Sequence, residues 1–452
     1  MEMVKNIFLS INNYLGLALP IWMESRKNLV IYFLLDSLIL LIIFQNTNPN
    51  YSVLRIVLFT LIWGLISYIF GRYSKNNKHT KIFLIFYFLI QNTFITILIT
   101  YLIEKTIIVF FKDIIPSGRN LFLYLGFGSL ILQSFRTFII YKFKIVRKSI
   151  FIVGEIKDIN IFKEKAKNHI DLHKIKVLSH SSIDESLKNN KSNFITIILV
   201  SSLEYLNNYD YILRESVKRN IEVLTSAEWF EKYLQKIPSE LISKNTLDYR
   251  KRSLINANSR MKRFCDILVS FFLLIITSPI LLISAILIKI EDNGPIIYTQ
   301  KRTGLYEQNF KIIKLRSMKV NSEKYGPVWA NKKDKRVTKI GALIRKTRID
   351  ELPQLWNVLI GDMSLIGPRP ERPEIEEELN RIIPNYKFRH IIKPGLSGWA
   401  QVNFPYGASV SDSSEKLSYD LFYIQNKSIW LDIFIFFKTI KIIFTMYGSS
   451  PK

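Results

Sequence analysis

Two adjacent carboxylates set among cations are the groups in this sequence best suited to do chemistry. Asp350 and Glu351 follow Arg345, Lys346 and Arg348 and precede a leucine, a proline and an apolar run. Proline is tolerated in the first turn of a helix, so both carboxylates are expected at or just before a helix N-terminus, which favours anions. Two carboxylates there can hold Mg²⁺, or one can hold the metal while the other attacks phosphorus. The alternative is an exposed acidic helix cap with surface salt bridges.

A second chemical feature is an arginine between two prolines, Pro368-Arg369-Pro370. The prolines stiffen the backbone, so the guanidinium becomes a preorganised bidentate clamp for an oxyanion. Several common catalytic classes are excluded, because the sequence has no G-x-x-x-x-G-K-[ST], H-E-x-x-H or G-x-S-x-G motif. The single cysteine, Cys265, excludes a Cys-based zinc site and an intramolecular disulfide framework.

Seven short motifs occur in order towards the end of the chain. They are KRFCD at 262–266, GP at 294–295 with QKRTG at 300–304, KLRSM at 314–318, DKRVTKIG at 334–341, DELPQL at 350–355, GPRP at 367–370 and PGLSGWAQV at 394–402. Together they resemble the bacterial sugar transferase family, the monotopic phosphoglycosyl transferases, over roughly residues 258–450. The preceding segments resemble those of long-form members, which prime exopolysaccharide, capsule or O-antigen synthesis on undecaprenyl phosphate.

The resemblance implies a two-step reaction. Asp350 would attack the β-phosphorus of a UDP-sugar, release UMP and carry a phosphosugar, which undecaprenyl phosphate then takes. Glu351 would hold Mg²⁺ together with Asp350 or activate the lipid phosphate, and both roles stay open. Arg348 stands where many short members have serine, so its role is open as well. The candidates for binding phosphate or nucleotide are Arg345, Arg369, Arg316, Lys314 and Arg336.

The composition indicates a membrane-associated protein. The chain has 452 residues, with 63 Lys+Arg against 37 Asp+Glu and 48% hydrophobic residues, which excludes a disordered chain. Residues 1–148 hold 16 basic and 5 acidic residues, 149–250 hold 15 and 14, and 251–452 hold 32 and 18. Segments that are both basic and apolar favour a membrane surface or phosphorylated ligands as partners over nucleic acid.

Four apolar stretches, at about 28–44, 54–70, 82–103 and 120–141, have lengths close to that of a membrane-spanning helix. They predict a four-helix transmembrane unit over residues 1–148, in which Asp36 and Arg136 face the interior or lie near an end. Basic residues precede the first stretch, separate the second from the third and follow the fourth, so both ends of the unit are expected in the cytoplasm. Four buried soluble helices are the alternative. No cleaved signal peptide is predicted at the start of the chain.

Residues 149–230 predict a small, Rossmann-like parallel α/β domain. Short apolar runs at 149–155, 174–178, 194–200 and 221–225 alternate with polar helical patterns. Gly154 stands where a dinucleotide-binding glycine loop begins, but Glu155 and Ile156 follow, so the full loop is absent. Neither Tyr205 nor Tyr209 has a lysine four residues later, which disfavours a nucleotide-sugar epimerase or dehydratase. We interpret the domain as structural or regulatory, and 231–258 as a polar linker.

A fifth apolar run, at 265–290, is flanked by Lys and Arg on both sides, which disfavours a full membrane crossing. Ser278-Pro279 lies near its middle, where proline removes a helix hydrogen bond and the serine can satisfy the freed carbonyl. We expect a re-entrant membrane helix that returns to the same face, with a kinked transmembrane helix as the alternative. The monotopic α/β catalytic domain, 259–452, then lies on the cytoplasmic face of a multi-pass protein of the bacterial inner membrane.

The leading hypothesis is therefore a membrane phosphoglycosyl transferase. The competing hypothesis is a catalytically inactive membrane scaffold for a polysaccharide assembly complex. The presence of Asp350, Glu351, Arg345 and Arg369 argues against the scaffold. The four predicted spans and the nearly neutral α/β domain are candidate contacts for a homodimer.

Overall fold

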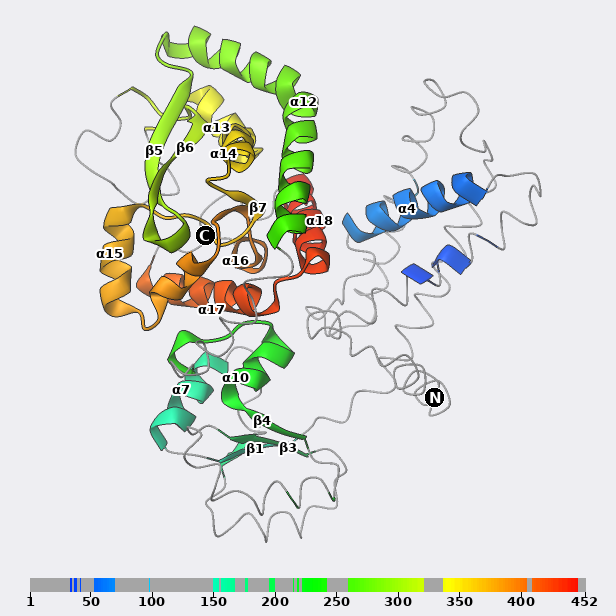
Figure 1. Ribbon diagram of the computed structural model, residues 1–452, viewed down its shortest axis with the longest axis vertical. Coiled ribbons are helices and arrows are strands. Elements are labelled where there is room, and N and C mark those ends of the chain that lie inside the picture. The colour runs from blue at the N-terminus through cyan, green and yellow to red at the C-terminus, as the bar shows by residue number, and fades with distance from the viewer. Residues whose placement is uncertain are drawn as a thin grey trace. The chain divides into compact units, whose positions relative to one another are not determined.

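The structure is a computed structural model that divides into two compact units, Met1–Arg147 and Lys148–Lys452 (Figure 1). The described residues are 33–34, 36–38, 41, 53–69, 97, 149–153, 156–166, 175–177, 195–199, 214, 218, 222–241, 259–320, 336–404 and 409–445. The two units are considered separately below.

The first unit contains helix α4, Val53–Ile69, at the position of the second predicted span. The side chains of Trp63 and Asp36 are both buried, and the Trp63 indole N–H donates to the Asp36 carboxylate at 3.2 Å. Asp36 therefore faces the interior, as the sequence predicts for a carboxylate inside an apolar stretch. The stretch at 120–141 and all of 82–103 except Ile97 lie outside the described residues, so the four-helix arrangement stays a prediction.

The second unit begins with a four-stranded parallel sheet. Its strands are β1 (Ser149–Val153), β2 (Ile175–Val177), β3 (Ile195–Leu199) and β4 (Glu222–Thr225), in the order β2-β1-β3-β4. Each strand falls within one of the four apolar runs predicted to form strands, and all neighbouring pairs are parallel. Helix α7, Ile156–Ala166, follows β1. The assignment of this sheet and its helix to a Rossmann-like domain stays a prediction.

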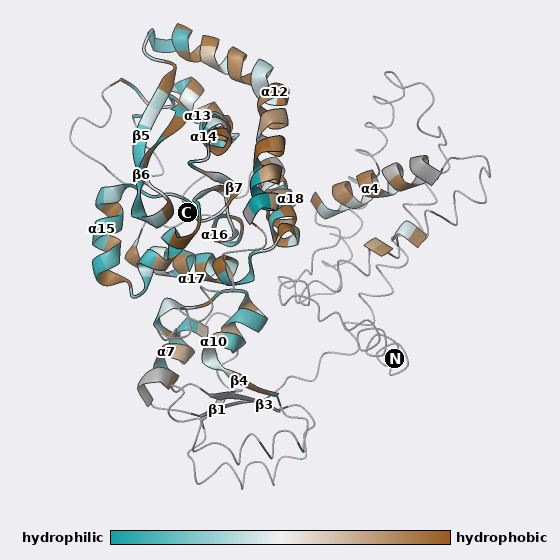
Figure 2. Ribbon diagram, in the orientation of Figure 1, coloured by the Kyte–Doolittle hydropathy of each residue, from teal (hydrophilic) through white to brown (hydrophobic). Residues whose placement is uncertain are grey.

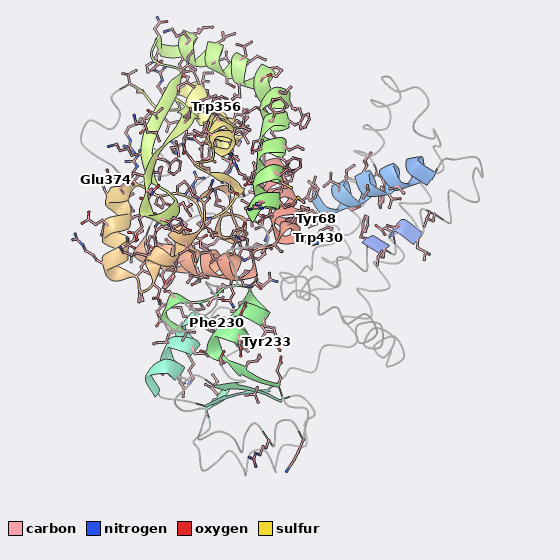
Figure 3. The ribbon with its side chains drawn as sticks, in the orientation of Figure 1. Tyr68, Phe230, Tyr233, Trp356, Glu374 and Trp430 are labelled. Carbon is pink, nitrogen blue, oxygen red and sulfur yellow. The ribbon has the colours of Figure 1, made fainter. Side chains whose placement is uncertain are left out.

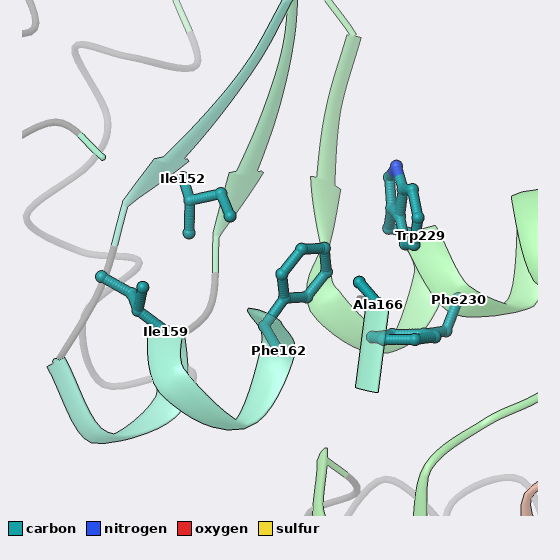
Figure 4. Close-up of a cluster of buried hydrophobic side chains, with 6 residues drawn as sticks. All are labelled: Ile152, Ile159, Phe162, Ala166, Trp229 and Phe230. Carbon is teal, nitrogen blue, oxygen red and sulfur yellow. The ribbon is translucent and has the colours of Figure 1, made fainter. Parts of the chain in front are cut away.

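A small aromatic core lies between this sheet, α7 and helix α10, Ser226–Trp229 (Figure 4). The rings of Trp229 and Phe230 each lie 5.2 Å from the Phe162 ring, centroid to centroid, in edge-to-face geometry. Thr225 and Glu228 form a capping box that starts α10 where β4 ends. The start of α10 and the aromatic pairs fix the direction in which the chain leaves the sheet.

The chain that leaves this core packs directly on the next part of the unit. A π-helical turn, Phe230–Leu234, ends at Gln235, whose carbonyl accepts from the Trp399 indole N–H at 2.9 Å. The Ile237 N–H donates to the Ser418 carbonyl at 2.8 Å, and buried Lys236 pairs with Glu415 at 2.6 Å. Residues 231–241 of the predicted linker are thus a docked segment, and 242–258 lie outside the described residues.

Helix α12, Ser259–Asp292, contains the fifth apolar run (Figures 1 and 2). It is the one helix in the described part of the chain that is long and apolar enough to cross a membrane, and only 11% of its most apolar window is buried. A straight helix of its 34 residues would measure about 51 Å. Figure 1 shows instead that α12 turns sharply partway along its length.

The turn in α12 has a local cause at Pro279. Proline lacks the N–H that would pair with the carbonyl of Ile275, four residues earlier. The Ser278 hydroxyl donates to that Ile275 carbonyl at 2.8 Å, and the Thr277 hydroxyl donates to the Leu273 carbonyl at 2.7 Å. The Ser278 contact is the one predicted from the sequence, and it lowers the cost of a kink inside an apolar helix.

Both ends of α12 contact the same globular body. At its start, Lys262 pairs with Asp432 at 2.7 Å, and Asp266 accepts from the Ser364 hydroxyl at 2.8 Å. At its end, the Glu291 carboxylate accepts from the Lys339 N–H at 2.7 Å. A helix tethered in this way leaves one body and returns to it, and its insertion in a membrane as a re-entrant helix stays a prediction.

That body is an α/β arrangement. Strands β5 (Ile297–Thr303) and β6 (Asn309–Leu315) form an antiparallel hairpin, and β7 (Ser364–Ile366) pairs parallel with β8 (Gly395–Ser397). The helices are α13 (Lys339–Lys346), α14 (Gln354–Ile360), α15 (Pro373–Ile382), α16 (Trp399–Asn403), α17 (Val410–Asn426) and α18 (Ile429–Thr445). These elements position the carboxylates and cations singled out in the sequence.

Candidate active site

The paired carboxylates lie on a tight turn between α13 and α14. Arg348 adopts a left-handed conformation with φ 58°, which ends α13 and starts a 3₁₀ turn, Ile349–Glu351. Pro353 then leads directly into α14. The carboxylates therefore lie just before a helix, as the proline predicts, but Asp350 is buried, with 8% of its surface exposed. Its burial excludes an exposed acidic cap.

Helix α14 is fixed to strand β6 by one buried amide. The Asn357 side chain accepts from the Ile313 N–H at 3.1 Å and donates to the Lys311 carbonyl at 2.8 Å. Both of these backbone groups lie on β6, one and three residues before Lys314. Asn357 thus helps to set the distance between Lys314 and the turn Ile349–Glu351 that precedes α14.

The other end of α14 is held by cations. The Arg263 guanidinium, from α12, donates to the carbonyls of Val358 at 2.5 Å and Leu359 at 2.7 Å. Lys393 donates to the Gly361 carbonyl at 2.7 Å. Positive charge at the C-terminal end of a helix satisfies its free carbonyls and complements its dipole. The start of the apolar helix α12 is therefore coupled to α14, the helix that follows the turn with Asp350 and Glu351.

Glu351 is held by three cations. Its carboxylate accepts from the Arg369 guanidinium at 2.5 and 3.4 Å, and it lies 3.8 Å from the Lys314 ammonium and 3.5 Å from the Arg348 guanidinium. Although burial favours the neutral acid, the charges of Arg369 and Lys314 hold the pKa of Glu351 well below its ordinary value. Glu351 is consequently a permanent anion.

The pKa of Asp350 is shifted in the opposite direction. Burial and the neighbouring Glu351 carboxylate raise its pKa from 3.8 to about 6, although Lys314, Arg345 and Arg369 act to lower it. At neutral pH the carboxylate is mostly ionised, yet its charge is poorly stabilised in the free protein. A carboxylate of this kind is suited to act as a nucleophile towards an electron-poor atom of a ligand.

The pKa of Lys314 is also shifted. Burial, opposed by the Glu351 charge, lowers the pKa of its ammonium from 10.5 to about 8, and the nearby cations Arg369 and Arg302 contribute to the same direction. The site is therefore crowded with positive charge. An incoming anion such as a diphosphate relieves this repulsion, so the electrostatics favour a phosphorylated ligand.

The loop that carries Arg369 is anchored on both sides. Buried Arg389 donates to the Arg369 carbonyl at 2.8 Å and pairs with Asp420 at 3.1 Å. Arg302 donates to the Pro370 carbonyl at 3.2 Å and pairs with Glu371 at 3.2 Å. These contacts, added to the two prolines, make the Arg369 guanidinium a fixed element of the site.

Close backbone packing explains the glycines that flank this loop. The Gly367 N–H donates to the Ser397 carbonyl and the Gly395 N–H to the Pro368 carbonyl, each at 2.8 Å. A Cβ atom on Gly395 would lie 2.0 Å from the Gly367 nitrogen. The GPRP and PGLSG motifs therefore meet in space, and only glycine permits their approach.

The structure brings together most, though not all, of the predicted site residues. Glu351, Arg369 and Lys314 are in contact, and Arg345 lies close enough to act on the charge of Asp350. Arg316 instead pairs with Asp292 at the end of α12, and the Arg336 carbonyl accepts from the Lys319 N–H. The proposed phosphate-binding roles of Arg316 and Arg336 stay predictions.

Several residues that shape the site were not singled out by the sequence. They are Arg302, Glu371, Arg389, Asp420 and Asn357. Arg302 belongs to the QKRTG motif, which was a signal for its importance but not for its contact with the Arg369 loop. The others lie on a 3₁₀ turn, a loop and two helices far apart in the chain. Their spacing in the sequence therefore did not predict that they come together in space.

The two carboxylates fit Mg²⁺ only with help from a ligand. Mg²⁺ is commonly bound by one or two carboxylates, with waters and substrate phosphates completing its octahedron. A divalent cation at Asp350 and Glu351 would relieve the repulsion that contributes to the raised pKa of Asp350. Among the described residues no group of three or more His, Cys, Asp or Glu could form a complete cage. A diphosphate would therefore have to supply further ligands.

Comparison with known proteins identifies the family. Residues 257–446 match the model of the bacterial sugar transferase family. The chain is 49% identical over 189 residues to UDP-N-acetylgalactosamine-undecaprenyl-phosphate N-acetylgalactosaminephosphotransferase of Aeromonas hydrophila, a match that covers 42% of this chain and 45% of that protein. It is 43% identical over 185 residues to UDP-glucose:undecaprenyl-phosphate glucose-1-phosphate transferase of Klebsiella pneumoniae, a match that covers 40% of each. The match therefore spans less than half the length of these two relatives.

A third relative is covered over most of its length. The chain is 39% identical over 186 residues to UDP-glucose:undecaprenyl-phosphate glucose-1-phosphate transferase of Caulobacter vibrioides, which is 41% of this chain and 70% of that protein. In each case the matched region has the length of the body that holds Asp350 and Glu351. With these carboxylates and their cations in place, the chain belongs to the bacterial sugar transferase family.

Proposed function

We propose that this protein transfers a sugar 1-phosphate from a UDP-sugar to undecaprenyl phosphate, with release of UMP. The observation that carries the proposal is the buried Asp350 carboxylate beside Glu351, which is itself paired with Arg369, Arg348 and Lys314; the pKa of Glu351 is held well below its ordinary value, whereas that of Asp350 is raised to about 6. The names of the three relatives above describe this class of reaction on undecaprenyl phosphate. The transfer would prime synthesis of an exopolysaccharide, capsule or O-antigen.

In the first step, a carboxylate oxygen of Asp350 attacks the β-phosphorus of the UDP-sugar. The bond between that phosphorus and the bridging oxygen breaks, its electron pair leaves with UMP, and an acyl phosphate joins Asp350 to the sugar phosphate. In the second step, an oxygen of undecaprenyl phosphate attacks the same phosphorus and restores the Asp350 carboxylate. Arg369, Lys314 and Arg345 hold the phosphate oxygens, while Glu351 keeps Arg369 and Lys314 in place.

Mg²⁺ belongs to this proposal as the ion that Asp350 and Glu351 would hold together with the diphosphate. When bound, it would neutralise charge on the diphosphate and on the leaving nucleotide. The residues of the chain provide the remaining cations at fixed positions. Removal of divalent ions by a chelator should therefore lower the rate of UMP release without unfolding the protein.

The membrane supplies the acceptor lipid, and the exposed apolar surface of this body supports an attachment to it. Helix α12 exposes Phe264, Phe271 and Ile276, among others. Trp356 on α14 and Trp430 at the start of α18 are also exposed, at 53% and 71% (Figure 3). Aromatic residues of this kind favour the membrane–water interface. We place α12 in one leaflet of the bacterial inner membrane as a re-entrant helix, with the active site at the cytoplasmic surface.

The test is UMP release by the purified full-length protein in detergent with Mg²⁺. UDP-glucose and UDP-N-acetylgalactosamine are supplied with and without undecaprenyl phosphate, and the wild type is compared with Asp350→Asn. The matched control is Glu378→Gln, on the exposed side of α15. Turnover with one sugar that requires the lipid, persists in Glu378→Gln and is lost in Asp350→Asn supports the proposal. No UMP from folded wild-type protein with any UDP-sugar would instead favour the inactive scaffold.

A further inference from the structure

Two side-chain nitrogen atoms, on residues four and five positions from Asp350 in the chain, are buried and have no hydrogen-bond partner among the described residues. One is Nε2 of Gln354, a residue with 3% of its surface exposed, and the other is Nη1 of Arg345. Buried donors in folded proteins are nearly always paired, because an unpaired one loses its hydrogen bonds to water without replacement. An orphan of this kind calls for an explanation, and a ligand that binds there is one.

The contrast with the next turn of α14 shows that the fold can satisfy a buried amide at this place. Asn357, only three residues later, has 1% of its surface exposed and forms hydrogen bonds to the Ile313 N–H, the Lys311 carbonyl and the Asp362 carboxylate. Gln354 is as deeply buried but leaves its N–H₂ group unused. The orphan donor is therefore a local feature of the catalytic turn.

The position of Gln354 relative to Asp350 indicates what the donor is for. Gln354 is the first residue of α14 and follows Asp350 by four residues, through the 3₁₀ turn Ile349–Glu351 and the helical Leu352 and Pro353, so the two residues lie on consecutive turns of one short helical segment. Arg345 acts on Asp350 from the other side of the sequence, since its charge is among those that oppose the raised pKa of Asp350. Both orphan donors thus belong to residues close to the carboxylate that is proposed to attack phosphorus.

We infer that Gln354 is a further catalytic residue, whose Nε2 donates to a non-bridging oxygen of the phosphoryl group that Asp350 attacks, with Arg345 Nη1 donating to another oxygen. This inference rests on the proposed function. It assigns the two donors to the same transferred group and adds no bond-making step to the reaction.

A neutral donor has an advantage at this place. Lys314, Arg345, Arg348 and Arg369 already surround the two carboxylates, and the mutual repulsion of cations contributes to the lowered pKa of Lys314. A further cation would add to that repulsion in the free protein. An amide instead offers an N–H to the phosphoryl oxygen without adding charge.

The inference is tested with Gln354→Met, which keeps the length of the side chain but removes the donor. The matched control is Gln425→Met on α17, because Gln425 Nε2 donates to the Glu231 carboxylate at 2.8 and 2.9 Å and lies outside the proposed site. Two quantities are measured on the full-length protein in detergent. They are the melting temperature without substrate and the single-turnover rate of UMP release without lipid.

For Gln354→Met we expect an unchanged or higher melting temperature, because the lost donor makes no hydrogen bond in the free protein, and a fall in UMP release of about 100- to 1000-fold. For Gln425→Met we expect a lower melting temperature and a rate within twofold of wild type. A Gln354→Met rate within threefold of wild type overturns the inference, as does a rate loss explained by a lower melting temperature. Absence of UMP release from the wild type itself overturns the proposed function and this inference together.

Discussion

Replacing the proposed nucleophile should stabilise the protein. Asp350 is buried beside Glu351, and its pKa is raised from 3.8 to about 6. Ionisation is therefore less favourable in the folded state than in the unfolded chain. Asp350→Asn removes that ionisation and keeps the shape of the side chain, so at neutral pH the variant should be more resistant to unfolding than the wild type.

The magnitude follows from the linkage between protonation and folding. A pKa that rises from 3.8 to about 6 corresponds to about 3 kcal/mol of destabilisation of the ionised form, and this is an upper bound on the gain in the variant. Between these two pKa values the folded state binds more protons than the unfolded state, so the stability contributed by this residue falls as pH rises. The penalty is fully present above about pH 6 and absent below about pH 4.

The assay is thermal unfolding of the wild type and Asp350→Asn in detergent between pH 4.5 and 8, combined with pulse proteolysis to follow the body that holds the site. We expect the variant to be the more stable protein at pH 7.5, with the difference shrinking as pH falls below 6. The control Glu378→Gln should show no such trend, because Glu378 is exposed. A variant equal to or less stable than the wild type at pH 7.5 would refute the reasoning about the buried Asp350 carboxylate.

Three further perturbations test the same architecture. Glu351→Gln removes the anion that helps raise the pKa of Asp350. The acid limb of the pH profile of kcat/KM, which we expect near pH 6 in the wild type, should therefore move to lower pH. A limb that stays in place would contradict the coupling between the two carboxylates. Asn357→Ala leaves the Ile313 N–H unsatisfied and should lower the free energy of unfolding by about 1–3 kcal/mol, measured by chemical denaturation. Pro279→Ala restores the helix hydrogen bond to the Ile275 carbonyl and should straighten α12. We expect Pro279→Ala to lower the rate of UMP release more than Ser278→Ala does. Equal activity in the two variants would argue against a functional role for the bend.

A good part of the fold could be predicted from local pattern. Four apolar runs predicted four parallel strands, and each contains one. The contact of Ser278 with the Ile275 carbonyl follows from the sequence, because proline always frees the carbonyl four residues before it. The position of the docked segment, 231–241, was not foreseen, since its partners on α16 and α17 lie more than 160 residues away in the chain.

The sequence by itself determined the chemistry available to this protein. The motif order specified the family, the adjacent Asp350 and Glu351 specified a carboxylate pair, and the prolines around Arg369 specified a stiff cation. These features depend on residues that are neighbours in the chain, where covalent geometry limits the distances. Local spacing is therefore enough to predict them.

Only the tertiary structure decided which cations meet which carboxylates. Lys314 and Arg369 pair with Glu351, whereas Arg316, two residues after Lys314, pairs with Asp292. The opposite pKa shifts of two adjacent carboxylates also arise there. Charge interactions depend on distance through space and on the exclusion of water, and both are set by the packing of strands and helices that are remote in sequence.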